Sequence, residues 1–367
     1  MQHWQETFPF DFSHPIINET FTEHALFFDI ETTGFSPART SLYLIGCAVR
    51  KDDTLIVDQF FADTPKEEVE VLYAFFQLLS GYDTIITFNG IGFDIPYLKS
   101  KCSTYDIPEP FSSHNYIDIY KSVSKLKFLL HLPNLKQKSI EQFLGLGRED
   151  LYNGGELIDV YHSYVKTRSP EALHLLKQHN YEDVIDMPNL LPILAYARLF
   201  EGDFHVTSIR ANQFTSYDGT LEKELIFTLE NHIALPSLVS CRHEDFYLTA
   251  EGSETRFVVR LFTGELKYFY PDYKNYVYLP EEDLAVPKAL ASSIEKDKKK
   301  KATASTCYTR KTAIFLPQHE PVIKPAFRTI YKDKKSYFEL SEEFISSKDL
   351  QKEYVLHILE YLKGCRK

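Results

Sequence analysis

An apolar run that ends in two alternating carboxylates constrains this chain more than any other feature. Residues 25–34 read Ala-Leu-Phe-Phe-Asp-Ile-Glu-Thr-Thr-Gly. Such a run predicts a short buried strand with apolar residues on both faces. Alternate residues of a strand point to the same face, so Asp29 and Glu31 would project together, about 7 Å apart along the chain. Ile30 would point to the opposite face and remain in the core.

Two neighbouring carboxylates repel each other unless something neutralises them. A hard cation such as Mg²⁺ or Mn²⁺, bound by oxygen ligands, is the usual solution in proteins. The alternative is a solvated strand end with a capping role. Thr32, Thr33 and Gly34 follow as a turn whose backbone a ligand could approach closely.

A third acidic candidate follows another predicted strand. Residues 84–88 are mostly apolar and lead into Asn-Gly-Ile-Gly-Phe-Asp at 89–94. The Asn and the two Gly favour a tight turn, and Pro96 suits the first turn of a helix. Asp94 would therefore lie near a helix N-terminus, over the end of the sheet. Asn89 would either contact a ligand or cap that helix.

The last candidates lie on a predicted helical segment, residues 170–200, which Pro188 and Pro192 would bend or divide. His179 and Asp183 are four residues apart, so they share one face of the helix. A histidine titrates near neutral pH and suits general-base chemistry. The alternative for His179 is a structural role, bonded to the first acidic segment or to a backbone carbonyl.

These segments resemble the motifs of the DEDD superfamily of 3′–5′ exonucleases, which have an RNase H-like fold. The string Asp-Ile-Glu-Thr-Thr-Gly is similar to the first motif, Asn-x-x-x-Phe-Asp to the second, and the string ending at residue 183 to the third. The resemblance implies a pair of Mg²⁺ or Mn²⁺ ions about 4 Å apart. The implied metal ligands are Asp29, Glu31, Asp94 and Asp183. The implied contacts to a terminal nucleotide are Thr32, Thr33, Gly34 and Asn89.

The position of the general base departs from the superfamily pattern. A Tyr four residues before the last Asp, or a His five residues before it, serves the attacking water in the superfamily. Here His179 occupies the Tyr-type position and Gln178 the His-type position. The string His-Asn-Tyr-Glu-Asp is similar to a bacterial RNase H-like subgroup, the YprB-like family. His179 is therefore a candidate base whose role the resemblance leaves open.

The order of elements predicts an α/β fold. We expect an irregular N-terminal arm (1–24), then a catalytic domain (25–203) with an RNase H-like mixed five-stranded sheet flanked by helices. Residues 204–367 are expected to form an α+β accessory domain of unknown role. In that region we expect a hairpin turn at 262–265, a helix at 282–294 and a terminal helix at 348–362. Asp118, which ends a predicted strand, is interpreted as a helix N-cap rather than a metal ligand.

Charge is distributed unevenly along the chain. The whole sequence has a net charge of −11, yet residues 286–367 contain 18 Lys+Arg and 10 Asp+Glu, a net of +8. A basic region on an acidic body could bind phosphate, and its aromatic residues could stack on bases. The alternative is a solvated basic surface with no partner.

The remaining composition favours a cytoplasmic protein. Its five Cys are scattered, without a disulfide or metal pattern, and no secretory signal or stretch long enough for a membrane span is present. By resemblance, we expect a metal-dependent hydrolase, a 3′–5′ exonuclease acting on single-stranded DNA or RNA. The alternatives are a structure-selective endonuclease on the same fold and a non-catalytic nucleic-acid-binding scaffold. Protein partners are left open.

Overall fold

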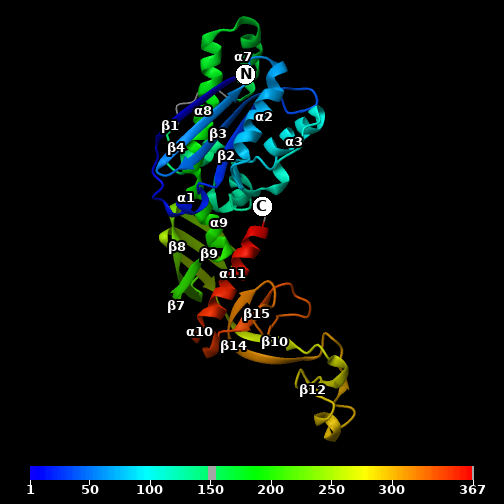
Figure 1. Ribbon diagram of the computed structural model, residues 1–367. Helices are drawn as coiled ribbons and strands as arrows, with labels where there is room; N and C mark the ends of the chain where they lie inside the picture. Colours follow the sequence, from blue (N-terminus) through cyan, green and yellow to red (C-terminus); the bar gives the residue numbers. More distant parts are fainter. Residues whose placement is uncertain (148–153, 366–367) are drawn as a thin grey trace. The chain divides into compact units, whose positions relative to one another are not determined.

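The computed structural model describes residues 1–147 and 154–365 (Figure 1). The chain divides into two compact units. The first contains Met1–Ala197 together with Leu235–Ser237, and the second contains Arg198–Ala234 and Leu238–Lys367. Among the described residues, no helix is both long and apolar enough to cross a membrane.

The first unit is built around a six-stranded mixed sheet in the order β1-β4-β3-β2-β5-β6. The pairs β2–β5 and β5–β6 are parallel and the other neighbours are antiparallel. This mixed sheet with flanking helices confirms the predicted α/β architecture of the RNase H-like type. The strands are β1 (Gln2–Pro9), β2 (Ala25–Thr32), β3 (Leu42–Lys51), β4 (Thr54–Phe61), β5 (Thr84–Thr87) and β6 (Asn115–Asp118).

The sixth strand comes from the segment that was expected to be an irregular arm, so that prediction is wrong. Strand β1 pairs with the edge strand β4 along its whole length. Its sequence carries a weak signal because an edge strand is exposed to solvent along much of its length, and here only Trp4 and Phe8 alternate with polar residues. Trp4 anchors the strand by packing against Phe61, with ring centroids 5.8 Å apart.

Helices cover both faces of this sheet (Figure 1). On one face, α2 (Glu68–Leu79) and α3 (Asp94–Tyr105) pack in the core that contains Phe28 and Ile30. On the other face, α7 (Gly154–Thr167) and α8 (Pro170–Leu190) pack in the core that contains Tyr43 and Phe61. Alternation along β2 therefore turns its two carboxylates toward α8. The other helices are α1 (Pro15–Thr20), α4 (Ile119–Ser124), α5 (Lys127–Leu130), α6 (Gln137–Phe143) and α9 (Leu194–Glu201).

Local sequence fixes both ends of α8. The Ser169 hydroxyl accepts a hydrogen bond from the Ala172 amide and caps the N-terminus, and Pro170 occupies the first turn. Pro188 lies in the last turn, and a short 3₁₀ turn separates α8 from α9. The predicted division of residues 170–200 into more than one helix is confirmed.

The second unit is rich in strands, and these form three small sheets of three strands each. The first sheet has β7 (Phe204–Thr215), β8 (Leu221–His243) and β9 (Phe246–Arg260). The second has β10 (Phe262–Phe269), β14 (Tyr308–Gln318) and β15 (Ser336–Glu339). The third has β11 (Tyr276–Leu279), β12 (Leu284–Pro287) and β13 (Lys300–Lys301). Among the described residues, two helices follow these sheets, α10 (Glu342–Ser346) and α11 (Lys348–Gly364).

Two local predictions for this unit are wrong, whereas the terminal helix is confirmed as α11. The expected helix at 282–294 is replaced by β12 and a 3₁₀ turn at Leu290–Ser293, since Pro287 cannot donate the hydrogen bond that a helix interior needs. The expected turn at 262–265 lies inside β10, which pairs with β14 from Phe262 to Phe269. Pairing with a distant strand overrides the local turn signal at Gly264.

Candidate active site

Three predicted site residues converge at the C-terminal end of β2. A register shift in the β2–β3 ladder falls between Glu31 and Thr32, and such a bulge redirects the side chains next to it. The Nε2 atom of His179 lies 3.7 Å from Oε1 of Glu31 and 3.3 Å from Oδ2 of Asp183. Each of the three offers one ligand atom, and these atoms lie within 4.8 Å of one another. The β2 end and consecutive turns of α8 thus form one polar cluster.

Asp29 is connected to the same helix through Asn180. The Asn180 Nδ2 donates to Oδ2 of Asp29 at 3.4 Å, and its Oδ1 accepts from Nε2 of Gln59 at 2.9 Å. Asn180 is completely buried. A Cβ atom on Gly46 would lie 2.2 Å from the Asn180 Oδ1, so the glycine leaves the space that this amide occupies. A buried carboxamide therefore orients the Asp29 side chain.

Asp94 contacts β2 from the N-terminus of α3. It is buried in the first turn of α3, and the backbone amides of Ile30 and of Asp94 itself donate to its carboxylate. The pKa of Asp94 is raised to about 7, chiefly by burial and to a smaller extent by the charge of nearby Asp118, against the lowering effect of these amide bonds. Asp94 therefore contacts the backbone of Ile30, the residue between the two carboxylates of β2.

The turn before α3 is held by Asp118. Its carboxylate accepts hydrogen bonds from the amides of Asn89 at 3.1 Å, Ile91 at 3.0 Å and Lys121 at 2.9 Å. The last of these caps α4, which confirms the N-cap interpretation of Asp118. Asn89 has a left-handed backbone with φ of 65°, and its carbonyl accepts from the amides of Gly92 and Phe93. In the described structure no side chain caps α3.

The turn after β2 is stabilised by its own hydroxyl groups. Thr32 Oγ1 donates to the Gly34 carbonyl at 3.0 Å, and Thr33 Oγ1 accepts from the Ser41 amide at 2.8 Å. The Thr40 hydroxyl also donates to the Gly34 carbonyl. A Cβ on Gly34 would lie 2.9 Å from Thr40 Cγ2, so a glycine suits this position. The turn is therefore preorganised next to the acidic cluster.

Sequence reasoning missed three residues around this site. Tyr43 is buried, and its hydroxyl donates to Oε2 of Glu31 at 3.5 Å. Burial raises the pKa of Tyr43 well above its usual range, with the Glu31 charge as a second cause. Phe35 is 89% exposed and meets the Phe93 ring edge-on at 5.9 Å. For the third, Asn180, the available signal is a polar residue inside an otherwise well-formed helix.

The donor set fits a hard divalent cation. All four predicted ligands are carboxylates, and oxygen donors are what Mg²⁺ and Mn²⁺ prefer. The pKa of Asp94 lies far above the 3.8 typical of aspartate, which means that its charge is poorly compensated in the protein alone. A cation at the end of β2 would supply that compensation.

Comparisons with known proteins give one family match. The model of the RNase_H superfamily matches residues 26–195. No curated protein matches the chain in sequence. Structural similarity extends to the family B DNA polymerase from Pyrobaculum calidifontis, with 16% identity, a TM-score of 0.38 and coverage of 48% of this chain and 26% of the polymerase. It also extends to E. coli exonuclease I in complex with a dT13 oligonucleotide, with 14% identity, a TM-score of 0.29 and coverage of 56% and 55%.

The chain thus spans about a quarter of that polymerase and about half of exonuclease I. Every predicted site residue, from Asp29 to Asp183, lies inside the segment that matches the RNase_H superfamily model.

Proposed function

We propose that this protein is a metal-dependent nuclease that hydrolyses phosphodiester bonds, as a 3′–5′ exonuclease on single-stranded DNA or RNA. One observation carries the proposal: Glu31, His179 and Asp183 converge within 4.8 Å at the end of β2. Asp29 and Asp94 are held at the same strand end, and the whole cluster lies within the segment that matches the RNase_H superfamily model.

The residues that would hold the metal are Asp29, Glu31, Asp94 and Asp183. Two Mg²⁺ or Mn²⁺ ions bound there would lower the pKa of a water molecule and offset the charge that develops on the phosphodiester. The Asn180 amide donates to the Asp29 carboxylate, and the Tyr43 hydroxyl donates to the Glu31 carboxylate. Hydrogen bonds of this kind keep metal ligands oriented.

His179 is the proposed general base. Its Nε2 lies 3.7 Å from Oε1 of Glu31 and 3.3 Å from Oδ2 of Asp183, so the ring is next to the carboxylates that would hold the metal and its water. In the reaction, the water oxygen bonds to phosphorus as the bond from phosphorus to the 3′ oxygen breaks. The water proton passes to Nε2 of His179, and the leaving oxygen takes up a proton from solvent.

The end of the substrate strand would meet the turn after β2. Phe35 offers an exposed ring on which a terminal base can stack, an interaction worth about 1–3 kcal/mol. The backbone of Thr32, Thr33 and Gly34 and the side chain of Asn89 are the proposed contacts to the same nucleotide. The string His-Asn-Tyr-Glu-Asp supports assignment to the YprB-like subgroup, and we propose a cytoplasmic location.

A nuclease assay on the full chain tests this proposal. Single-stranded DNA, duplex DNA and RNA, each labelled at the 5′ end, are incubated with Mg²⁺ or Mn²⁺. Stepwise shortening from the 3′ end is expected, and Asp29→Asn or Asp183→Asn should reduce the rate by at least about 10³-fold. Internal cuts at branched structures would instead identify the endonuclease alternative. Binding without cleavage by either metal would identify the scaffold alternative.

A further inference from the structure

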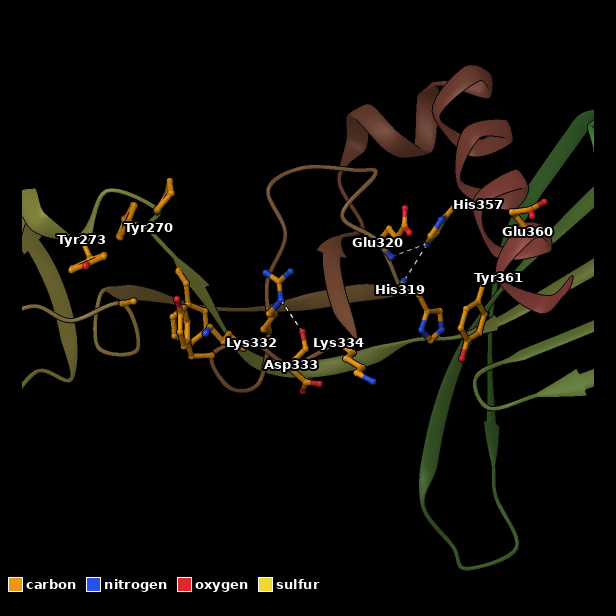
Figure 2. A pocket seen from close by; sticks show the side chains of 15 residues that line it. Tyr270, Tyr273, His319, Glu320, Lys332, Asp333, Lys334, His357, Glu360 and Tyr361 are labelled. Atoms are coloured by element: carbon orange, nitrogen blue, oxygen red, sulfur yellow. Dashed lines mark hydrogen bonds between the residues drawn. The ribbon is translucent and has the colours of Figure 1, made fainter. Parts of the chain in front are cut away.

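The second unit contains a cavity of about 900 Å³, which is large for a ligand site. The side chains that line the cavity lie one after another along its length (Figure 2). Tyr270 and Tyr273 lie at one end, Lys332 and Lys334 lie in the middle, and the Tyr361 ring lies at the other end.

The cations in the middle of the cavity are available to a ligand. The ammonium groups of Lys332 and Lys334 form no ion pair or hydrogen bond with any residue in the described part of the chain, and both side chains are exposed. The Lys332 ammonium lies over the Tyr331 ring, 5.7 Å from its centroid. Arg328 also lines the cavity and donates its Nε–H to the Asp333 carbonyl at 3.1 Å. That bond fixes the guanidinium, whose remaining N–H groups can donate to an anion.

Three acidic residues, Glu320, Asp333 and Glu360, also line the cavity, and two of them are bonded to neighbouring side chains. Glu360 pairs with Lys363, and Oδ2 of Asp333 accepts from the Thr329 hydroxyl at 2.7 Å. Most of the lining belongs to residues 286–367, the segment with a net charge of +8. The lining itself has three cations, Arg328, Lys332 and Lys334, and three carboxylates, so an anion would be held by the nearest cations and not by a net positive charge.

Aromatic rings at both ends are held in place by stacking. Tyr270 stacks on Tyr276 with centroids 4.6 Å apart and planes 18° apart. At the other end His319 stacks on Tyr361 at 3.3 Å and 8°. The Nε2 of His319 is buried and has no hydrogen-bond partner among the described residues. Burial lowers the pKa of His319 to about 4, so the ring that stacks on Tyr361 is neutral.

We propose that this cavity binds a segment of single-stranded nucleic acid. Rings at the ends and cations between them match unpaired bases that flank phosphates, and rings that stack on bases require those bases to be unpaired. The inference rests on the proposed function for the class of ligand. A double helix would leave the rings at both ends without a base to stack on.

Binding of a fluorescent 12-nucleotide oligothymidylate to the full chain in EDTA tests the inference, because EDTA prevents cleavage. The double variant Lys332→Gln/Lys334→Gln should bind about 10-fold more weakly. It should also lower the slope of log affinity against log salt by about 1.4, the loss of two phosphate contacts. The matched control Lys296→Gln/Lys300→Gln removes the same charge from the same basic segment outside the cavity lining, and its affinity should stay within about 2-fold.

A second variant tests the aromatic end. Tyr273→Leu should weaken binding about 5-fold or more, with the thermal unfolding temperature unchanged. Ultraviolet cross-linking of an oligonucleotide that contains 4-thiothymidine should mark peptides that include Tyr270, Tyr273 or Tyr331. The inference would be overturned if the cavity double variant and the control double variant lost the same affinity, or if the wild type did not bind. Tighter binding of a duplex of equal length would also overturn it.

Cleavage of the same oligonucleotide with Mn²⁺ separates this inference from the proposed function. If the wild type binds and the cavity variant does not, but neither cleaves, the cavity assignment holds and the nuclease proposal fails. If the wild type cleaves and the cavity variant binds as tightly as the wild type, the nuclease proposal holds and the cavity assignment fails.

Discussion

Asp94 is the most buried of the four predicted metal ligands, so its protonation responds strongly to folding. The folded protein raises its pKa from 3.8 to about 7, so folding favours the protonated form. The stability that comes from this group is present in full below pH 4. It is lost as the pH rises toward 7, because the folded state then buries a charge that the unfolded state keeps in water.

The variant Asp94→Asn should remove this pH dependence. In EDTA at pH 8, we expect it to unfold at a higher temperature than the wild type, by several degrees, and at pH 4 the two should agree. Mn²⁺ at pH 8 should raise the unfolding temperature of the wild type more than that of the variant. Parallel pH profiles for the two proteins, followed by circular dichroism, would contradict this explanation.

Gly46 makes room for the amide that orients Asp29. In Gly46→Ala, the new Cβ would lie 2.2 Å from Asn180 Oδ1 and 2.7 Å from Val184 Cγ2. We expect a loss of about 1–3 kcal/mol in unfolding free energy and weaker Mn²⁺ binding. The control Gly147→Ala should change neither, since no atom of the described residues lies within 4 Å of a Cβ there.

The double variant Gly46→Ala/Asn180→Ala distinguishes orientation from packing. A smaller side chain at position 180 should recover part of the lost stability, because it removes the clash with the new Cβ. Mn²⁺ affinity should stay low, because Asp29 has then lost its amide partner. Recovery of both quantities in calorimetry would show that Asn180 acts only as a space filler.

A buried ion pair ties two helices to the segment that links β2 to β3. Lys101 on α3 lies 2.8 Å from Oε1 of Glu68 on α2, and both side chains are buried. Glu68 also accepts from the Leu42 amide at 2.6 Å, and Lys101 donates to the Thr40 carbonyl. These bonds hold the segment whose threonine contacts the Gly34 turn.

Lys101→Met should destabilise the protein by about 3–5 kcal/mol, because it leaves the Glu68 carboxylate buried without its cation. The double variant Glu68→Leu/Lys101→Met should recover much of that loss, since no buried charge then remains. Urea unfolding at pH 7 measures both. A double variant as unstable as the sum of the two single variants would show that the pair does not act as a unit.

Elements with a strong local pattern could be predicted from the sequence, and those that depend on distant partners could not. An apolar run predicts strand β2. The helical spacing of apolar residues and the capping Ser169 predict α8. Strand β1 is exposed and becomes a strand only through β4, and the Gly264 region becomes one only through β14. Likewise, the contacts of Asn180 and Tyr43 join segments more than ten residues apart, which local sequence does not encode.

For the molecule as a whole, the sequence identifies one half much better than the other. The carboxylate motifs and the RNase_H superfamily match both fall between residues 26 and 195. In the second unit, β10 pairs with β14 and β14 with β15 across long intervening segments, so the cavity could be predicted only as a basic, aromatic segment. The net charge of +8 over residues 286–367 indicated the basic region, but only the fold shows which of its lysines line the cavity.

Calorimetric titration of the full, metal-free chain with Mn²⁺ at pH 7.5 tests whether the four carboxylates form a metal centre. We expect saturable binding to the wild type with a limit of two ions per chain, and clearly weaker binding to Asp29→Asn and Asp183→Asn, with circular dichroism unchanged. Binding of Mn²⁺ to both variants as tightly as to the wild type, or no binding to the wild type at millimolar concentrations, would contradict the assignment of this centre.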